Sequence, residues 1–263
     1  MTRRIHRSAD FHVTLDLKRD DFLRPPRDSQ RNWMLNRSMR EFADELTHLD
    51  SVADSFVRGG DGASMSDRTT TQLADEAIME DWQIPVMRAM AAAVCEGSGD
   101  ILEIGFGRGV ASNMIQEHGV RSHTISECNP SVIQRFHQWR TEFPDSDIRL
   151  LEGLWQDRVS DMQQYDGVFF HTYPLNEEEF VEQVVQSVTF AEHFFPTASE
   201  HLRPGGVFSY LTNEFDSISR AHQRLLFRHF GSFTLSEVSD LAVPEDTNDA
   251  MWAKSMIVVR AVK

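Results

Sequence analysis

The stretch DILEIGFGRG, residues 100–109, decides the fold that this sequence predicts. A short apolar run carries one acid, Glu103, and then breaks into three glycines at alternate positions, Gly105, Gly107 and Gly109. An amphipathic segment follows at once, so the order predicts a buried strand, a tight turn and a helix. Glycine lets the backbone approach a ligand closely, and the first turn of a helix presents unpaired N–H groups to the same place. We therefore expect a small ligand to bind at this turn.

The bulk properties are those of a globular protein with an acidic surface. The 263 residues include 40% apolar and 25% charged residues, the net charge is −15 and the pI is about 5.1. General binding of nucleic acid through phosphates needs a basic surface, so we expect no nucleic-acid partner. No apolar run approaches the roughly 18 residues that span a bilayer, and no apolar segment follows the basic N-terminus, so we expect neither a membrane span nor a secretory signal.

Cysteine and histidine usage points to a reducing compartment and to no metal. Cys95 and Cys128 are the only cysteines, which favours a cytoplasmic location over a disulfide framework. The 11 histidines are scattered without an HExxH or CxxC pattern, so we expect no metal site.

Outside the glycine turn, strands alternate with helices. Further strands are expected at 123–126, 148–151, 166–170, 207–211, 233–243 and 253–262, and helices at 29–57, 71–95 with a break near Pro85, 130–139, 177–202 and 218–230. This alternation predicts an α/β fold, a doubly wound and mostly parallel sheet with helices on both faces. We expect residues 1–70 to form an N-terminal helical extension, and residues 71–263 to form the ligand-binding domain. The Gly- and Ser-rich stretch 59–67 makes the extension either a lid or a passive attachment.

Two further turns complete the predicted ligand site at the carboxyl ends of the strands. Glu127 lies about 20 residues beyond the glycine turn, where a carboxylate accepts hydrogen bonds from both hydroxyls of a ribose. The turn Gly153-Leu154-Trp155 offers backbone and an apolar side chain to an adenine. A dinucleotide site needs the spacing GxGxxG, whereas Glu103 here begins the pattern ExGxGxG. The spacing therefore favours S-adenosylmethionine, whose cationic methionine end suits Glu103.

From residue 77 onward the chain resembles guanidinoacetate N-methyltransferase and, more weakly, the fungal arginine δ-N-methyltransferases. The segments that carry the resemblance are AIMEDWQIPVMRAMAAA (77–93), ILEIGFGRGVAS (101–112), ECNPSVIQRFHQW (127–139), EGLWQD (152–157), DGVFFHTYPLNEEEF (166–180), LRPGGVFSY (202–210) and VPEDTNDAMWAKSM (243–256). The resemblance implies the class I methyltransferase fold and S-adenosylmethionine as cofactor. The positions that match the cofactor site are Met79, Glu103, Gly105, Phe106, Gly107, Glu127, Cys128, Gly153, Leu154 and Trp155.

The acceptor positions depart from the family. Two acids of the family hold the guanidinium of the substrate, and Gln83 and His171 stand in their places. A guanidinium stays protonated near neutral pH and pairs best with carboxylates, so the exchange weakens the case for guanidinoacetate. His171 is the candidate general base, with a role in capping the strand and contacting the cofactor as the alternative. Gln83, Thr172, Tyr173 and Glu214 are the candidate acceptor residues, and Glu80, Asp81 or Glu214 are nearby acids that would restore the missing charge.

The predicted function is S-adenosylmethionine-dependent methylation of a small molecule. Because the nearest family methylates nitrogen, an amino, guanidino or heterocyclic nitrogen is the first choice, with a role in specialised metabolism. An O- or C-methyltransferase of a natural-product intermediate is the alternative within catalysis. A regulatory homologue that binds the cofactor without turnover is the alternative outside it. A homodimer is a further expectation, with no residue assigned to its interface.

Overall fold

The computed structural model describes residues 68–69, 72–185, 187–212, 214, 218–244 and 253–263. The chain divides into two compact units. One unit comprises residues 1–65 and 216–225, of which only 218–225 are described, including the first part of helix α11 (Arg220–His229). The other unit, residues 66–215 and 226–263, holds the sheet and the candidate site. Apart from Arg68 and Thr69, the predicted N-terminal extension lies outside the described residues, so its helix remains a prediction.

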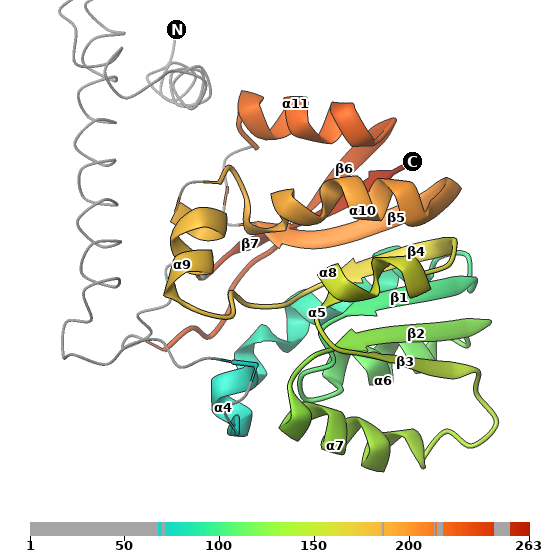
Figure 1. Ribbon diagram of the computed structural model, residues 1–263. Coiled ribbons are helices and arrows are strands. Elements are labelled where there is room, and N and C mark those ends of the chain that lie inside the picture. Colours follow the sequence, from blue (N-terminus) through green and yellow to red (C-terminus); the bar gives the residue numbers. More distant parts are fainter. Residues whose placement is uncertain (1–67, 70–71, 186, 213, 215–217, 245–252) are drawn as a thin grey trace, which may run out of the picture. The chain divides into compact units, whose positions relative to one another are not determined.

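The sheet has seven strands in the order β3-β2-β1-β4-β5-β7-β6 (Figure 1). Their bounds are β1 Asp100–Ile104, β2 Ser122–Glu127, β3 Ile148–Glu152, β4 Tyr165–Phe170, β5 Leu202–Thr212, β6 Ser232–Val238 and β7 Met256–Val262. The first five strands run parallel, and β7 pairs antiparallel with both β5 and β6. The predicted doubly wound, mostly parallel sheet is confirmed. The chain turns back between β1 and β4, which makes their carboxyl ends the switch point where such sheets bind ligands.

Helices cover both faces of the sheet (Figure 1). Their bounds in the larger unit are α4 Asp75–Ile78, α5 Ile84–Cys95, α6 Val110–Glu117, α7 Pro130–Arg140, α8 Trp155–Arg158, α9 Glu177–Phe180 and α10 Phe195–His201. Prolines open two of them as expected, Pro85 in the first turn of α5 and Pro130 in that of α7. Proline fits there because the first turn needs no N–H donor from it.

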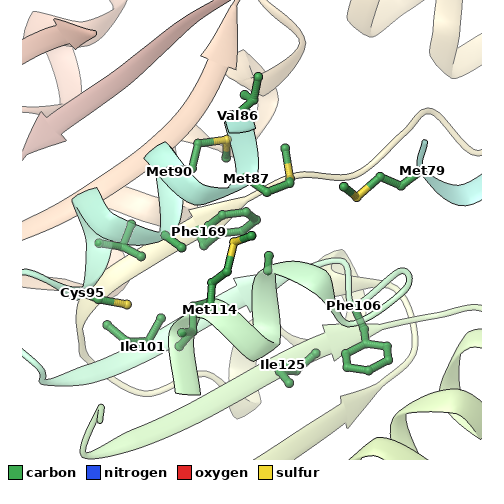
Figure 2. Packing of buried hydrophobic residues seen from close by; sticks show 14 of the residues in the cluster. Met79, Val86, Met87, Met90, Cys95, Ile101, Phe106, Met114, Ile125 and Phe169 are labelled. Atoms are coloured by element: carbon green, nitrogen blue, oxygen red, sulfur yellow. The ribbon is translucent and has the colours of Figure 1, made fainter. Parts of the chain in front are cut away.

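The core beneath α5 and α6 reaches the site. Met87 and Met90 of α5 are almost fully buried, and Figure 2 shows them beside Phe169 of β4. Met79, from the segment between α4 and α5, and Phe106, from the loop after β1, belong to the same buried cluster. Packing of the core therefore fixes the loops that line the site.

The predicted single helix over residues 177–202 is wrong. Short α9 passes into a π-helical turn, Val181–Val185, and a 3₁₀ turn, Phe190–Phe194, precedes α10. Pro196 explains the restart, because proline in a helix interior removes a hydrogen bond and collides with the preceding turn. The fifth strand also begins earlier than predicted, at Leu202. The segment before Pro85 breaks sooner than expected as well, since Met79 has extended backbone after the single turn of α4.

A network of four charged side chains joins β1, β4 and β5 near the amino ends of these strands, at the end of the sheet opposite the glycine turn. Arg121 donates to both oxygens of Asp100 (2.7 and 2.5 Å) and to Asp166 (2.9 Å). Arg203 bridges the same two acids, at 2.8 Å from Asp100 and 2.7 Å from Asp166. The hydrogen bond from Arg121 is the main reason that the pKa of Asp100 is held well below its usual range.

Among the described residues, no helix is long and apolar enough to cross a lipid bilayer.

Candidate functional site

The glycine turn after β1 adopts backbone that only glycine enters readily. Gly105, Gly107 and Gly109 have φ angles of +90°, +57° and +76°. A Cβ atom at Gly105 would collide with the backbone carbonyl oxygen of His171, and one at Gly109 would lie 2.8 Å from the ring of Phe106. The spacing of glycines in the sequence therefore reflects close approach of two loops as well as the turn itself.

Backbone hydrogen bonds join the carboxyl ends of four neighbouring strands. The N–H of His171 donates to Ile104 (3.2 Å), that of Gly105 to Ser126 (2.9 Å), and that of Gly153 to the backbone carbonyl of Glu127 (2.8 Å). The loops that follow β1, β2, β3 and β4 are thus held together at the carboxyl ends of the strands. The turns predicted to contact ribose, adenine and methionine do come together.

The side chain of Glu127 connects the loops after β1 and β2 by hydrogen bonds. Its Oε2 accepts the N–H groups of Phe106 (3.0 Å) and Gly107 (3.5 Å), and its Oε1 accepts those of Cys128 (2.8 Å) and Asn129 (2.9 Å). The carboxylate thus holds the glycine turn against the loop after β2. Ribose hydroxyls would join these donors or displace the long bond from Gly107, so the predicted ribose role remains open to test.

Glu103 is fully buried at the end of β1 and has one engaged oxygen. Ser112 donates to its Oε2 (2.6 Å), and the imidazole Nε2 of His123 lies 2.9 Å from the same atom. The other oxygen, Oε1, has no hydrogen-bond partner among the described residues. Gln116 contacts the remaining ring nitrogen of His123 at 3.1 Å. An unsatisfied buried carboxylate oxygen is costly, so this atom is suited to a cationic ligand group.

Two adjoining clefts open at this edge and share six lining residues. The shared residues are Gly105, Glu127, Cys128, Thr172, Tyr173 and Leu175. The larger cleft has an empty volume of ≈ 680 Å³ and adds Met79, Glu103, Phe106, Gly107 and His171. The smaller has an empty volume of ≈ 410 Å³ and adds Gly153, Leu154, Trp155 and His193. All ten predicted cofactor residues therefore line one cleft or the other.

The segment between α4 and α5 carries Gln83 and is fastened to the glycine turn. Gln83 is buried, its Oε1 accepts the N–H of Glu80 (3.1 Å), and its Nε2 donates to Tyr173 Oη (3.3 Å). Arg108 donates from the glycine turn to the carbonyl of Met79 (2.8 Å) and to Asp81 (2.9 Å). Gln83 itself does not line either cleft in the described residues but acts on the larger one through Tyr173.

His171 lies at the end of β4, beside the glycine turn, and lines the larger cleft. Burial lowers the pKa of its imidazole to about 4, because desolvation disfavours the charged form. Its ring packs edge-on against Tyr173 with centroids 5.9 Å apart. The imidazole is therefore neutral near pH 7 and has a nitrogen lone pair that can receive a proton.

The acids considered as substitutes for the missing charge do not line the clefts. Glu80 accepts the indole N–H of Trp82 (2.7 Å), and Asp81 pairs with Arg108 with 78% of its side chain exposed. Glu214 follows β5, where its N–H donates to Thr212 (3.4 Å), and it is absent from both described linings. The described acids that do line them are Glu103, Glu127 and Glu179, and each accepts a hydrogen bond from the protein.

Several lining residues were not predicted from sequence. Arg68 lies with its guanidinium carbon 5.1 Å above the ring of Tyr173, and its backbone is tied to Leu175 (3.1 Å) and to Asn129 (2.6 Å). His193 contacts Trp155 in the smaller cleft, with ring centroids 5.7 Å apart. Asn129 had a usable signal, since Asn before Pro is a strong helix N-cap and its side chain does cap α7. Arg68 and His193 had none, because only tertiary packing brings them here.

This sheet order, with a glycine turn after β1 and an acid at the end of β2, is that of class I methyltransferases. A crystal structure of a spermidine synthase in complex with a transition-state analogue has this fold, with a TM-score of 0.50 and 17% identity. The match covers 70% of this chain and 61% of that chain, and it shows the fold alone. The guanidinoacetate N-methyltransferase family model matches residues 58–224, and the chain belongs to this family. Family and fold together place it among the S-adenosylmethionine-dependent methyltransferases.

Curated relatives match over shorter stretches. Protein arginine N-methyltransferase 2 of Eremothecium gossypii is 26% identical over 146 residues, 51% of this chain and 32% of the relative. The protein of the same name from Kluyveromyces lactis is 29% identical over 156 residues, 55% of this chain and 35% of the relative. This chain therefore spans about a third of the length of these relatives along the matched region.

S-adenosylmethionine is the cofactor that the family uses and that this site fits. The buried, unpartnered Oε1 of Glu103 suits its ammonium group, and the glycine turn leaves room for close approach of backbone. The class and the cofactor predicted from the sequence are confirmed.

Proposed function

We propose that this protein transfers a methyl group from S-adenosylmethionine to a nitrogen that carries no positive charge before it reacts. The observation that carries the proposal is the neutral imidazole of His171 at the position of a family acid. A small molecule with a heterocyclic, aromatic amino or amide-like nitrogen, which is neutral near pH 7, is the acceptor class that this arrangement supports best.

The pKa of His171 argues against a guanidinium acceptor. A guanidinium stays protonated near neutral pH, and the pKa of the His171 imidazole is lowered to about 4, so transfer of the guanidinium proton to this imidazole is strongly unfavourable. A nitrogen that is already neutral avoids this cost, because its lone pair is available before the reaction starts.

Each side of the site then has a defined task. When bound, S-adenosylmethionine supplies an electrophilic methyl group on a positively charged sulfur. Glu103 would hold its ammonium group and Glu127 its ribose, while Gly153 and Trp155 would contact the adenine. S-adenosylhomocysteine would be the leaving group of this transfer, and the imidazole of His171 would receive the proton that the acceptor nitrogen loses. Alignment and exclusion of water supply most of the rate, and proton removal assists.

An arginine side chain of a protein is the second candidate acceptor. It is favoured by the similarity to protein arginine N-methyltransferase 2 of Eremothecium gossypii and Kluyveromyces lactis. The described cleft supports it less well, because Glu127 and Glu179 already accept backbone N–H groups and the unpartnered oxygen of Glu103 is assigned to the ammonium group of the cofactor. A place in specialised metabolism, a cytoplasmic location and a homodimer remain predictions, as do the O- or C-methylating and non-catalytic alternatives.

The test is methyl transfer from S-adenosylmethionine labelled in the methyl group, followed by mass spectrometry of the acceptors. The panel contains heterocyclic amines, primary amines, amides, guanidino compounds and arginine-containing peptides. We expect label on neutral nitrogen compounds and little on guanidino compounds or peptides. Preferential labelling of peptidyl arginine would overturn the proposal in favour of the second candidate. Tight binding of the cofactor without transfer to any acceptor would favour the regulatory alternative.

A further inference from the structure

His193 lies in the 3₁₀ turn Phe190–Phe194, which is fastened to the sheet. Phe194 is fully buried and stacks on Phe170 of β4, with ring centroids 4.8 Å apart. The carboxylate of Glu192 accepts a backbone N–H at the start of the turn (3.0 Å). Packing and this hydrogen bond therefore hold the backbone that carries His193.

The tautomer of the His193 imidazole follows from its partner. The carbonyl oxygen of Phe190 lies 2.6 Å from Nδ1, and a carbonyl can only accept, so Nδ1 carries the proton. Desolvation by burial lowers the pKa of the imidazole, and the hydrogen bond to Phe190 offsets only part of this effect, so the ring is neutral near pH 7. Nε2 is consequently a hydrogen-bond acceptor without a donor among the described residues.

The Nε2 atom of His193 is open to the smaller cleft. The imidazole packs against Phe170, Phe190 and Trp155, with ring centroids 5.6, 5.1 and 5.7 Å away. His193 is not among the described residues that bury an unpartnered polar atom, so solvent reaches Nε2. Since three aromatic rings surround the imidazole and the residue lines the smaller cleft, the accessible nitrogen faces that cleft.

The position of the smaller cleft indicates which part of the cofactor it takes. Glu103 lines only the larger cleft, Glu127 lines both, and Trp155 lines only the smaller one. With the ammonium group at Glu103 and the ribose at Glu127, as proposed above, the adenine would lie in the smaller cleft. The exocyclic amino group is the hydrogen-bond donor of adenine, whereas its ring nitrogens are acceptors. An acceptor such as Nε2 therefore matches the amino group.

We propose that His193 selects the adenine base of the cofactor by accepting a hydrogen bond at Nε2 from its exocyclic amino group. This inference rests on the proposed function for the places of the ribose and the ammonium group, and it is independent of the methyl acceptor. Because Nδ1 is already used, the neutral ring offers the base an acceptor and no donor. Hypoxanthine, which has a carbonyl oxygen in place of the amino group, would turn a lone pair toward Nε2.

The experiment compares three homocysteine nucleosides by calorimetric titration of the full chain. They are S-adenosylhomocysteine, S-inosylhomocysteine and the analogue whose purine has no substituent at position 6. We expect wild type to bind S-adenosylhomocysteine about 3- to 10-fold more tightly than the unsubstituted analogue, the usual contribution of one neutral hydrogen bond. The preference over S-inosylhomocysteine should be about 10- to 100-fold, because Nε2 is then left without a donor.

Two variants separate the acceptor nitrogen from the shape of the ring. His193→Phe keeps an aromatic ring but removes the acceptor, so both ratios should fall toward one. His193→Gln places an amide that both accepts and donates, so it should keep the preference over the unsubstituted purine and lose that over hypoxanthine. His118→Phe makes the same change at an exposed position and should leave both ratios as in wild type. Thermal unfolding of each variant checks that it folds, and the glutamine variant carries the test if the phenylalanine variant does not fold.

The outcomes distinguish this inference from the proposed function. Failure of wild type to bind S-adenosylhomocysteine would overturn both, whereas tight binding with equal affinity for the three nucleosides overturns only the present inference. Unchanged ratios in folded His193→Phe would also overturn it and would assign the amino group to Glu179 or Gln183, which line the same cleft. An equal loss of affinity for all three nucleosides in both variants would overturn it as well, because His193 would then only shape the cleft.

Discussion

The two halves of the site differ in what builds them. The cofactor half depends on backbone at three glycines with positive φ, and on a carboxylate, Glu127, whose four accepted hydrogen bonds all come from backbone N–H groups. The proposed acceptor half depends on the side chains of Gln83, His171 and Tyr173, whose chemistry changes with single substitutions. A site built from backbone is constrained by the fold. In a site built from side chains, single substitutions can change the charge and the hydrogen-bond donors without changing the fold. This contrast accounts for a chain that keeps the cofactor of its family and carries Gln83 and His171 at two positions where the family pattern has acids.

The largest expected effect tests the acceptor half. His171→Ala should lower kcat by about 10²- to 10⁴-fold, the usual contribution of a general base, while the affinity for S-adenosylhomocysteine changes little. In wild type the rate should fall only as the pH drops toward about 4, since the imidazole is neutral above that value. The variant should lack this acidic limb in a pH–rate profile.

His118→Ala, at an exposed position on the C-cap of α6, is the matched control and should match wild type. Equal turnover of His171→Ala and wild type would leave His171 with a structural role at the strand end.

The next effect tests the claim that backbone builds the cofactor half. Gly105→Ala combines a φ of +90° with a collision against the carbonyl oxygen of His171, and should destabilise the fold by about 2–4 kcal/mol and abolish cofactor binding. Thermal unfolding and calorimetric titration measure the two consequences.

Two other glycines separate the causes. Gly119→Ala has a φ of +65° with no atom within 4 Å of the new Cβ, so it should cost about 1 kcal/mol through the backbone alone. Gly97→Ala has open space and no positive φ, and should be neutral or slightly stabilising. A cost at Gly105 no greater than that at Gly119 would contradict the close approach of the two loops.

A smaller loss of cofactor affinity is expected on substitution of Glu127. Glu127→Gln keeps the shape but replaces two acceptor oxygens by one oxygen and an NH₂ group that faces backbone donors. Hydrogen bonds to a charged group contribute about 1.5–3 kcal/mol, so the affinity for S-adenosylhomocysteine should fall about ten- to hundredfold. Calorimetry with Glu152→Gln as the exposed control checks this. An unchanged affinity would remove Glu127 from the cofactor site.

The smallest expected effect is on stability and concerns Asp100, which lies outside both halves at the amino end of β1. Asp100→Asn should destabilise the protein by about 1 kcal/mol or less, because Arg121 is 62% exposed and solvent screens the pair. The pKa of Asp100 is depressed in the folded protein, so its contribution is complete above the unfolded value near 3.8 and is lost as the pH falls below it.

Denaturant titrations at neutral and acidic pH should therefore converge for variant and wild type in acid. Turnover should be unaffected at neutral pH. Asp145→Asn, at an exposed position, is the matched control. A loss of activity larger than the loss of stability would mean that this edge communicates with the site.

The sequence was sufficient for the parts of the fold that local patterns encode. The spacing at Gly105 and the prolines that open α5 and α7 predicted the glycine turn and two helix starts. The prediction of one helix over residues 177–202 was wrong because the spacing of the apolar residues is that of a long helix. Pro196 and the extended backbone of Thr189 divide the segment. The predicted cofactor residues line the two clefts, and all but Met79 belong to or follow strands in a fixed order, which a local pattern can indicate.

The acceptor half was less predictable because its function depends on pairings between distant segments. Gln83 and Tyr173 are 90 residues apart in sequence, and no local pattern indicates that one donates to the other. Likewise, nothing near Arg68 predicts that it lies on the ring of Tyr173. The sequence identified the changed residues but not the direction of the hydrogen bonds between them.

The central claim is that the cofactor half is intact while the acceptor half rejects guanidinium groups. The most direct measurement is transfer of labelled methyl from S-adenosylmethionine to matched neutral-nitrogen and guanidino acceptors by wild type and by the double variant Gln83→Glu, His171→Asp. Both proteins should bind S-adenosylhomocysteine with similar affinity. Wild type should label the neutral acceptors, and the double variant should gain activity on guanidino compounds. Preference of wild type for guanidino compounds, with no gain in the double variant, would contradict the account.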